Sequence, residues 1–358
     1  MSKPVAIDRA HGGGAVAQGV LDFSISVNPL GPPAAAKAAY EAAWSRATSY
    51  PPAKSALLEE RLATWLRVPV GNVVVGNGTT QLIYLLARVL EPARAFVVIP
   101  TFSEIANALA GEGLPPEPIP LSRHNDFHLD LHQIDDALAS HAGAIFLGRP
   151  NSPTGTLLSI AEVQTIAARC ANRGCWCVID EAFIDFVEPP DSAVQLAAEN
   201  PRLIVLRSLT KSFAIPGLRL GCVVAPQEVA NALRDAIEPW SVNVAAEGVG
   251  LACLEGADEY LEQTRRVVAA ERTFLSESLG KAAGVRVYPS AANFLMLEVS
   301  GEASDGEFAR NLADRSVAVR DLRTLPGCST GQYRIGIRNR ADNERLVQAT
   351  IEVQGNRG

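Results

Sequence analysis

The chain has 358 residues, of which 47% are hydrophobic and 20% are charged. This composition is typical of a globular protein and argues against a disordered, collagen-like or coiled-coil chain, and the length predicts about two domains. Asp and Glu number 39 against 32 Lys and Arg, so the formal net charge is −7. Because an acidic chain without a basic stripe is poorly suited to neutralising phosphates, we expect no nucleic-acid partner.

The sequence also gives expectations about membranes, metals and compartment. The N-terminal stretch MSKPVAIDRA has no apolar core, and no run approaches the ~18 apolar residues of a membrane span, so we expect no signal peptide and no membrane partner. Three of the six cysteines cluster in CANRGCWC, but no second pair or nearby His completes a zinc set. We therefore predict buried thiols, no metal site and a reducing, cytoplasmic location.

Short apolar runs alternate with helical patterns through the first two-thirds of the chain. Residues 1–35, rich in Gly and Pro, predict an N-terminal arm, and residues 36–245 predict a large domain. Strands are predicted at 73–75, 95–99, 144–147, 175–179, 203–206 and 221–225. Helices are predicted between them at 79–90, 103–110, 160–172 and 227–237. This alternation indicates an α/β fold with a mostly parallel sheet covered on both faces.

Residues 246–358 have a different pattern, which predicts a smaller α+β C-terminal domain. A long amphipathic helix at about 248–279 precedes VRVYPSAANFLMLEV, a further helix, and the strand-like segments SVAVRDL and QYRIGIR. Arginines accumulate in this last part of an otherwise acidic chain, at Arg315, Arg320, Arg323, Arg334, Arg338 and Arg340. This local excess of positive charge calls for an explanation.

The loops after the predicted strands carry the candidate functional residues, because ligands of such sheets bind at the carboxyl ends of the strands. After strand 73–75, the sequence GNGTT opens directly into a helix. The backbone N–H groups of Gly78, Thr79 and Thr80 can bind an anion at such a helix start. The alternative is a plain glycine turn with a threonine N-cap.

Two later loops add a carboxylate and an amine. DEAFIDF places Asp180 at a strand end, and SLTKSFAIPGLRLG supplies Ser208, Thr210, Lys211 and Arg219. A lone lysine is usually a solvated charge, but burial near other cations lowers its pKa and makes the amine a nucleophile for a Schiff base. A lysine for an imine, an aspartate for a pyridinium nitrogen and hydroxyls, N–H groups and Arg219 for a phosphate together predict a pyridoxal phosphate site.

These motifs, with PNSPTG, resemble the fold-type I, aspartate-aminotransferase-like enzymes over nearly the whole chain. The chain looks similar to histidinol-phosphate aminotransferases and more so to threonine-phosphate decarboxylases of cobalamin biosynthesis. The latter resemblance lies in HGGG, LDFSISVNPLGPP, PTFSE, DEAFIDF, EPWSVN and VRDLRTLPG followed by YRIGIRNRADN. It implies a large domain with a mostly parallel seven-stranded sheet, pyridoxal phosphate as cofactor and a homodimer.

The resemblance also implies roles for individual residues at the cofactor. Lys211 would form the Schiff base, Asp180 would contact the pyridine nitrogen and Phe102 would stack on the ring. Tyr50, in SYPP, would reach the cofactor phosphate of the neighbouring subunit. Phe183 stands where aminotransferases usually have a tyrosine phenol against the ring oxygen.

One motif departs from the family pattern. The family often has Asn-Asn-Pro-Thr-Gly where this chain has Asn-Ser-Pro-Thr-Gly. Either Asn151 or Ser152 would therefore contact the ring oxygen. Arg149, directly before this motif, has no explanation in the sequence.

On the substrate side, the resemblance gives part of the arginine excess a meaning. Arg334 matches the position that pairs with the substrate α-carboxylate, and Arg320 would bind a phosphate on the substrate. His11, Asn28 and Gly31 would fold over the mouth of the site as a lid. We expect Arg315, Arg323 and Arg340 to be solvated surface charges and leave Arg338 unassigned.

Three functions follow as hypotheses. The first is decarboxylation of L-threonine O-3-phosphate to (R)-1-amino-2-propanol O-2-phosphate, with a phosphorylated amino acid as the substrate class. The second is an aminotransferase acting on histidinol phosphate or a related phosphorylated amino compound. The third, a non-catalytic pyridoxal phosphate-binding or regulatory protein, is disfavoured because Lys211, Asp180 and Arg334 are all present and no DNA-binding segment is attached.

Overall fold

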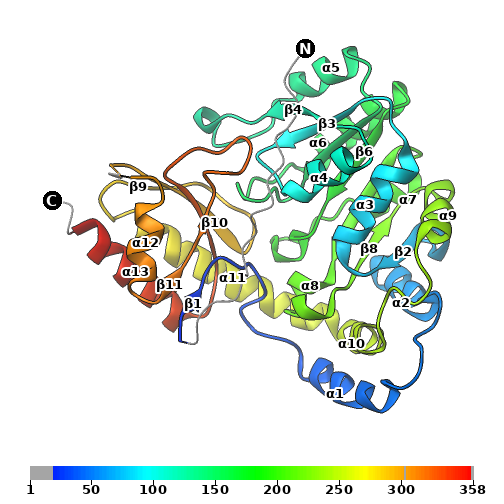
Figure 1. Ribbon diagram of the computed structural model, residues 1–358, viewed down its shortest axis with the longest axis horizontal. Helices are drawn as coiled ribbons and strands as arrows, with labels where there is room; N and C mark the ends of the chain where they lie inside the picture. The colour runs from blue at the N-terminus through cyan, green and yellow to red at the C-terminus, as the bar shows by residue number, and fades with distance from the viewer. Residues whose placement is uncertain (1–18, 302–303, 356–358) are drawn as a thin grey trace.

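Two main sheets with their helices and one two-stranded sheet make up the structure, which is a computed structural model that describes residues 19–301 and 304–355. Figure 1 shows the larger sheet and its helices on the right and the smaller, C-terminal sheet and its helices on the left. Within these described residues, no helix is both long enough and apolar enough to cross a membrane.

The larger sheet has seven strands, of which one runs against the rest. Their order is β2 (Val73–Gly76), β8 (Gly221–Val224), β7 (Leu203–Ser208), β6 (Trp176–Asp180), β5 (Ala144–Gly148), β3 (Ala95–Ile99) and β4 (Glu117–Pro120). β8 is antiparallel to both of its neighbours, whereas β7, β6, β5, β3 and β4 are parallel to one another. The prediction of a mostly parallel seven-stranded sheet is therefore confirmed.

Helices cover both faces of this sheet because successive side chains of a strand point to opposite faces. Val97 packs in the apolar cluster that includes α3 (Gly78–Leu90), α4 (Ser103–Gly111) and α9 (Gln227–Ala236). The next residue, Val98, packs in the cluster on the other face. That cluster includes side chains of α2 (Ala56–Leu66), α5 (Leu131–Ala139), α6 (Ile160–Asn172) and α7 (Val194–Glu199).

The smaller sheet is antiparallel and forms the C-terminal part of the fold. Its order is β12 (Arg320–Asp321), β13 (Gln332–Gly336), β10 (Phe294–Val299) and β9 (Val285–Val287). A second apolar core joins this sheet to α11 (Ala257–Leu279), α12 (Glu307–Ala313) and α13 (Arg340–Gly355). This confirms the predicted smaller α+β part of the chain, which brings Arg320 and Arg334 onto adjacent strands.

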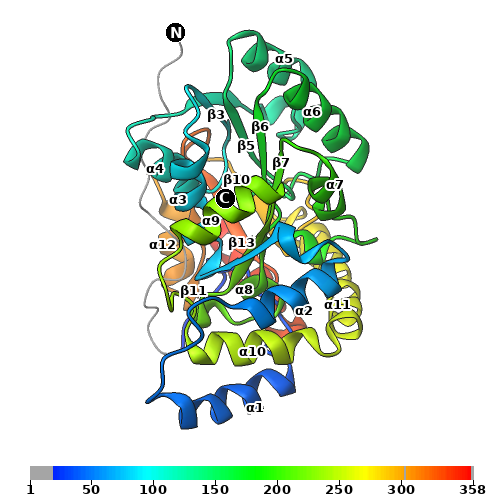
Figure 2. The same ribbon diagram turned by 90° about the vertical axis from the view of Figure 1, so that its right-hand side faces the viewer.

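The prediction of one long helix at about 248–279 is wrong. Two helices occupy this region, α10 (Val244–Leu254) and α11, and they are separated at Gly256, whose φ is +78°. A left-handed residue ends α-helical hydrogen bonding, and glycine adopts this conformation without steric cost. The break lets α10 pack against α1 (Ala34–Ala43) while α11 runs on to the smaller sheet (Figure 2).

The segment before α1 connects the two parts of the structure. Its strand β1 (Leu21–Asp22) pairs in parallel with β11 (Val317–Ala318), and Gly336 N donates to Phe23 O at 2.7 Å. Further along, Asn28 N donates to Lys211 O at 3.0 Å. The segment thus contacts both the smaller sheet and the lysine-bearing loop, and the boundaries 1–35, 36–245 and 246–358 stay a prediction.

The contact of this segment with β13 depends on the absence of a side chain at Gly336. A Cβ there would lie 2.0 Å from Ile25 O. We predict that Gly336→Ala lowers the free energy of unfolding by about 1–3 kcal/mol, because the segment must move away from β13. Urea unfolding measures this difference. Gly111→Ala is the control, since a Cβ there has no atom within 4 Å; equal stability of the two variants would contradict the prediction.

Candidate active site

A cavity of about 440 Å³ lies where the carboxyl ends of β5, β6 and β7 face the smaller sheet. The loops after β3, β5, β6 and β7 line it together with the start of α3. The N-terminal segment adds Ser24, Ile25 and Ser26 to the wall, and the C-terminal part adds Arg320, Leu322, Leu325 and Arg334. The cavity therefore collects residues from the whole length of the described chain.

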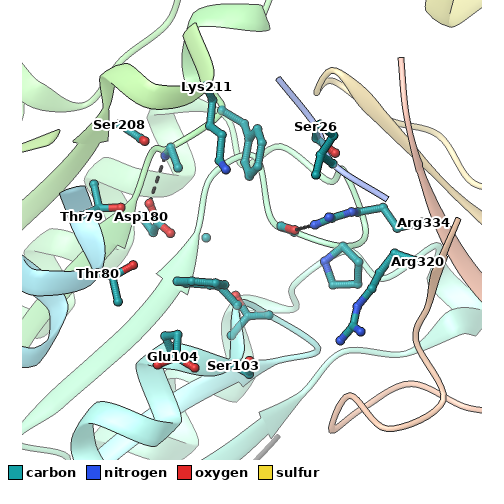
Figure 3. Close-up of a pocket in the computed structure, with 18 of the residues that line it drawn as sticks. Ser26, Thr79, Thr80, Ser103, Glu104, Asp180, Ser208, Lys211, Arg320 and Arg334 are labelled. Atoms are coloured by element: carbon teal, nitrogen blue, oxygen red, sulfur yellow. Dashed lines mark hydrogen bonds between the residues drawn. The ribbon is translucent and has the colours of Figure 1, made fainter. Parts of the chain in front are cut away.

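Hydroxyl groups gather on one side of this cavity. Thr79, Thr80 and Ser208 lie there in Figure 3, and Ser208 Oγ lies 2.8 Å from Thr210 Oγ1. Arg219 also lines the cavity. Four threonine and serine residues, a helix start and a guanidinium form a donor set that suits a phosphate group.

Glycine is required where the start of α3 approaches Arg219. Gly78 has a φ of +77°, and a Cβ on it would lie 2.5 Å from Arg219 Nη2. On neighbouring β8, a Cβ on Gly221 would lie 2.9 Å from Thr79 N. Because these two positions carry no side chain, the start of α3 can lie close to the Arg219 guanidinium and to β8. A larger residue at either position would occupy this space.

Lys211 lies between two parts of the cavity wall (Figure 3). One is the hydroxyl side, formed by Thr79, Thr80 and Ser208, and the other is the arginine side, formed by Arg320 and Arg334. It belongs to the short helix α8 (Leu209–Ser212), directly after β7. Burial lowers the pKa of Lys211 to about 8, with further lowering by Arg334 and Arg219, while Asp180 opposes the shift. A substantial fraction of the amine is therefore neutral in mildly alkaline solution, which a nucleophile requires.

Asp180 ends β6 on the floor of the cavity, and its Oδ1 accepts a hydrogen bond from Ala182 N at 3.0 Å. Burial raises the pKa of Asp180 to about 6, and the Ala182 N–H and Lys211 limit the rise. A cationic N–H partner placed against this carboxylate would stabilise its charged form. The residue is therefore suited to hold a protonated ring nitrogen.

Two arginines form the opposite side of the cavity. Arg334 Nη1 donates to Ser152 Oγ at 3.0 Å and Nη2 donates to Ser24 O at 2.8 Å. Its Nε is buried without a hydrogen-bond partner among the described residues. Burial and then the charge of Arg320 lower the pKa of Arg334 to about 10. Two repelling cations in one wall make that wall a site for an anion.

Asn151 and Ser152, two neighbouring polar residues of the PNSPTG turn, have different surroundings. Asn151 Oδ1 accepts from Thr101 Oγ1 at 2.9 Å, and its Nδ2 donates to Pro100 O at 2.8 Å. Ser152 borders the cavity, where it contacts Arg334. Which of the two contacts a ring oxygen stays a prediction, although only Ser152 lies in the cavity wall.

Both phenylalanines of the prediction, Phe102 and Phe183, line the cavity. Phe183 also packs edge-on against Phe294 with ring centroids 4.9 Å apart. Phe102 lies in the loop after β3 and directly precedes α4. Aromatic faces of this kind can enclose a flat heterocycle.

Other candidates lie outside the cavity wall. Asn28 Nδ2 donates to Ser212 O at 2.8 Å, and Gly31 O accepts from the Tyr260 hydroxyl at 2.5 Å. Tyr50 is 80% exposed, and His11 lies outside the described residues. The lid formed by His11, Asn28 and Gly31 and the cofactor contact of Tyr50 stay predictions.

Several residues of the cavity wall were not predicted from the sequence. Ser26, Ser103 and Glu104 line the cavity and are labelled in Figure 3. Ser103 and Glu104 belong to PTFSE, so the loop position of that motif could have found them. Ser26 is 4% exposed and its Oγ has no hydrogen-bond partner among the described residues, but only the three-dimensional path of the arm reveals this.

Because the pKa of Asp180 is raised, we predict that the free energy of unfolding of the cofactor-free protein depends on pH. The pKa of Asp180 in the folded protein, about 6, exceeds its usual value of 3.8, so stability falls as the pH rises from about 4 to about 6. We predict that Asp180→Asn raises the free energy of unfolding by about 2 kcal/mol near pH 7.5 and has no effect below about pH 4. Urea unfolding across this pH range, with exposed Asp136→Asn as control, measures it; a pH-independent difference would contradict the burial account.

Comparison with known proteins agrees with this geometry. The chain is 36% identical over 335 residues to the threonine-phosphate decarboxylase of Salmonella typhimurium, covering 93% of this chain and 91% of the relative. It is 30% identical to the histidinol-phosphate aminotransferase of an Anaeromyxobacter species, covering 99% of this chain and 95% of that protein.

The fold is shared as well. The crystal structure of the histidinol-phosphate aminotransferase from Clostridium acetobutylicum superposes with a TM-score of 0.86 at 24% identity, covering 94% of this chain and 100% of that chain. Residues 18–349 match the family described as aminotransferase class I and II. The family resemblance predicted from the sequence motifs is confirmed: the chain belongs to the aminotransferase class I and II family.

Proposed function

We propose that the protein is a pyridoxal phosphate-dependent decarboxylase that converts L-threonine O-3-phosphate to (R)-1-amino-2-propanol O-2-phosphate and carbon dioxide in cobalamin biosynthesis. The observation that carries the proposal is the placement of Arg320 and Arg334 across the cavity from the hydroxyl side. One cationic region can bind the cofactor phosphate while the other binds a substrate with two anionic groups. The identity to the Salmonella threonine-phosphate decarboxylase supports this substrate.

Pyridoxal phosphate fits the donors of the cavity. Its phosphate matches the hydroxyl side, its pyridine nitrogen matches Asp180 and its aldehyde matches the amine of Lys211. Phe102 and Phe183 supply apolar wall for the ring. When bound, the cofactor supplies an electron sink that stabilises negative charge on the substrate Cα.

Lys211 serves as the cofactor-binding amine and as the proton donor. With the substrate amine bound in its place, Lys211 Nζ would lie inside the cavity without a covalent partner. Decarboxylation removes the carboxylate carbon as carbon dioxide and requires one proton at Cα in its place. Because the pKa of Lys211 is lowered to about 8, Nζ can hold this proton and release it near neutral pH.

The two arginines orient the substrate. Which group leaves Cα would depend on how these arginines hold the substrate. Arg334 bound to the substrate carboxylate would retain that group and favour loss of the Cα proton, as in transamination. We propose that the substrate phosphate binds between Arg320 and Arg334 instead, which would leave the carboxylate without an arginine partner and able to depart as carbon dioxide.

The second candidate function is an aminotransferase acting on histidinol phosphate or a related phosphorylated amino compound. The identity of 30% over 99% of this chain to a histidinol-phosphate aminotransferase favours it. Histidinol phosphate has a phosphate but no carboxylate. Its phosphate could bind at Arg320 and Arg334, whereas threonine phosphate would bring a second negative charge near this repelling pair.

We propose further that the protein is a homodimer. Tyr40, Trp44, Tyr50 and Trp240 are 55%, 83%, 80% and 50% exposed, and the Tyr50 and Trp240 rings lie 4.9 Å apart. These four residues, here called the aromatic patch, are exposed aromatic side chains of the kind that is enriched at protein interfaces. In a dimer, Tyr50 would be free to reach the phosphate side of the partner's cavity.

A cytoplasmic location is also part of the proposal. All six cysteines are free thiols, and five of them are buried. Burial raises the pKa of Cys222 to about 12 and that of Cys253 to about 12. Such thiols stay reduced and unreactive in a reducing compartment, which supports this location.

The reaction is tested with threonine phosphate. We predict carbon dioxide release by the loaded enzyme, and we predict that Arg320→Ala raises KM at least about tenfold for threonine phosphate but not for threonine, since a lost charge-assisted contact costs about 1.5–3 kcal/mol. Arg323→Ala is the control, because Arg323 is exposed and pairs with Asp321 at 3.3 Å. Keto-acid-dependent amino transfer without carbon dioxide release would refute the decarboxylase and favour the second function.

The dimer is tested by charging the aromatic patch. We predict that Trp44→Glu converts the protein to a monomer in sedimentation equilibrium and weakens cofactor retention, because a carboxylate cannot be buried in an apolar interface. Ile351→Glu is the control, since Ile351 is 48% exposed on α13, apart from the patch. A Trp44→Glu variant that stays dimeric would exclude the patch as the interface.

A further inference from the structure

A chain of buried ionic side chains runs behind the cavity and is used by no step above. Arg149 is fully buried, and its Nε donates to Leu158 O at 2.8 Å. Its Nη1 donates to Glu181 Oε1 at 2.8 Å, and its Nη2 donates to Asp191 Oδ2 at 2.7 Å. The Glu181 side chain is equally buried and accepts a second hydrogen bond from Ser192 Oγ at 2.5 Å.

The chain continues to the segment that carries Lys211. Arg207 Nη1 donates to Ser192 Oγ at 3.1 Å, and Arg207 Nη2 donates to Asp185 Oδ1 at 2.5 Å. The second oxygen of Asp185 accepts from Ser212 Oγ at 2.5 Å. A continuous set of charge-assisted hydrogen bonds therefore links Arg149, at the end of β5, to Ser212 in α8.

Two members of this ionic chain directly follow cavity residues in the sequence. Glu181 directly follows Asp180, and Ser212 directly follows Lys211. In addition, Arg149 N donates to Asp180 O at 2.8 Å. A shift of the ionic chain would therefore move the backbone that carries the carboxylate and the amine of the cavity.

We propose that Arg149 is a positioning residue: through Glu181 and the rest of the ionic chain, it fixes the orientation of the Asp180 carboxylate and the Lys211 amine toward the cofactor. The inference rests on the proposed pyridoxal phosphate site. The two guanidinium groups of this network, Arg149 and Arg207, are each paired with a carboxylate. An arrangement that separated either arginine from its carboxylate would leave a buried charge without a partner, so the observed arrangement is favoured.

The geometry at Arg149 also explains why an arginine stands there. Its planar guanidinium contacts Leu158 O, Glu181 and Asp191 at once. A lysine carries the same charge on a single nitrogen, whose donors do not spread in a plane to three separate acceptors. Arg149→Lys therefore keeps the charge but loses part of the positioning, which separates the two effects.

The test measures cofactor binding by wild type, Arg149→Met and Arg149→Lys. We expect the Kd for pyridoxal phosphate to rise roughly tenfold or more in Arg149→Met and less in Arg149→Lys, as is usual when a group supporting a ligand-binding residue is removed. The pH midpoint of the visible absorbance of the loaded protein should shift in the same order. Arg340→Met is the control: Arg340 Nε contacts Glu271 Oε1 at 3.0 Å in the smaller part of the structure, and the variant should keep both values.

Folded Arg149 variants with the wild-type Kd and the wild-type midpoint would overturn the proposal and leave Arg149 a purely structural residue. If Arg149→Met does not fold, Arg149→Lys alone decides by the same two readouts. Binding of pyridoxal phosphate requires no substrate, so a failure of carbon dioxide release would refute the proposed reaction without touching this inference. A wild-type protein that binds no pyridoxal phosphate would overturn both.

Discussion

The burial of Lys211 between two arginines and an aspartate is the constraint on which the rest of the cavity depends. Burial and the charges of Arg334 and Arg219 lower its pKa to about 8, while Asp180 acts in the opposite direction. When no anion is bound, the positive charges of these side chains repel one another inside the cavity. Anionic groups on both sides of the lysine relieve the repulsion, and this requirement explains why the cavity has a hydroxyl side and an arginine side.

The fold meets this requirement by bringing distant segments to one edge of the larger sheet. Asp180 and Lys211 follow neighbouring parallel strands, so their spacing is set by β6 and β7. Arg334 comes from the smaller sheet and is held by Ser24 O of the N-terminal segment. The site therefore needs both sheets and the N-terminal segment. That segment can pass close to β13 because Gly336 has no side chain.

Much of the larger sheet was predictable because hydrophobic runs and the loops after them are local features. Strand 95–99 and helix 160–172 were predicted with the bounds that the structure has. Strand β4 was missed because Pro118 and Pro120 are unfavourable in a strand, and they are tolerated here at the edge of the sheet. The single helix at 248–279 was wrong because no proline marks the break and one glycine, Gly256, does not by itself predict the end of a helix.

The candidate site was predictable only as far as its residues stand in motifs. Asp180, Lys211 and Arg334 line the cavity, but the contacts of Arg149 join positions up to 42 residues apart along the chain and no local pattern reveals them. The most direct test of the account is borohydride reduction of the loaded protein followed by peptide mass spectrometry. We predict the cofactor's mass on the peptide containing Lys211; labelling of Lys3, Lys37, Lys54 or Lys281 instead, or no labelling, would contradict the proposed Schiff base.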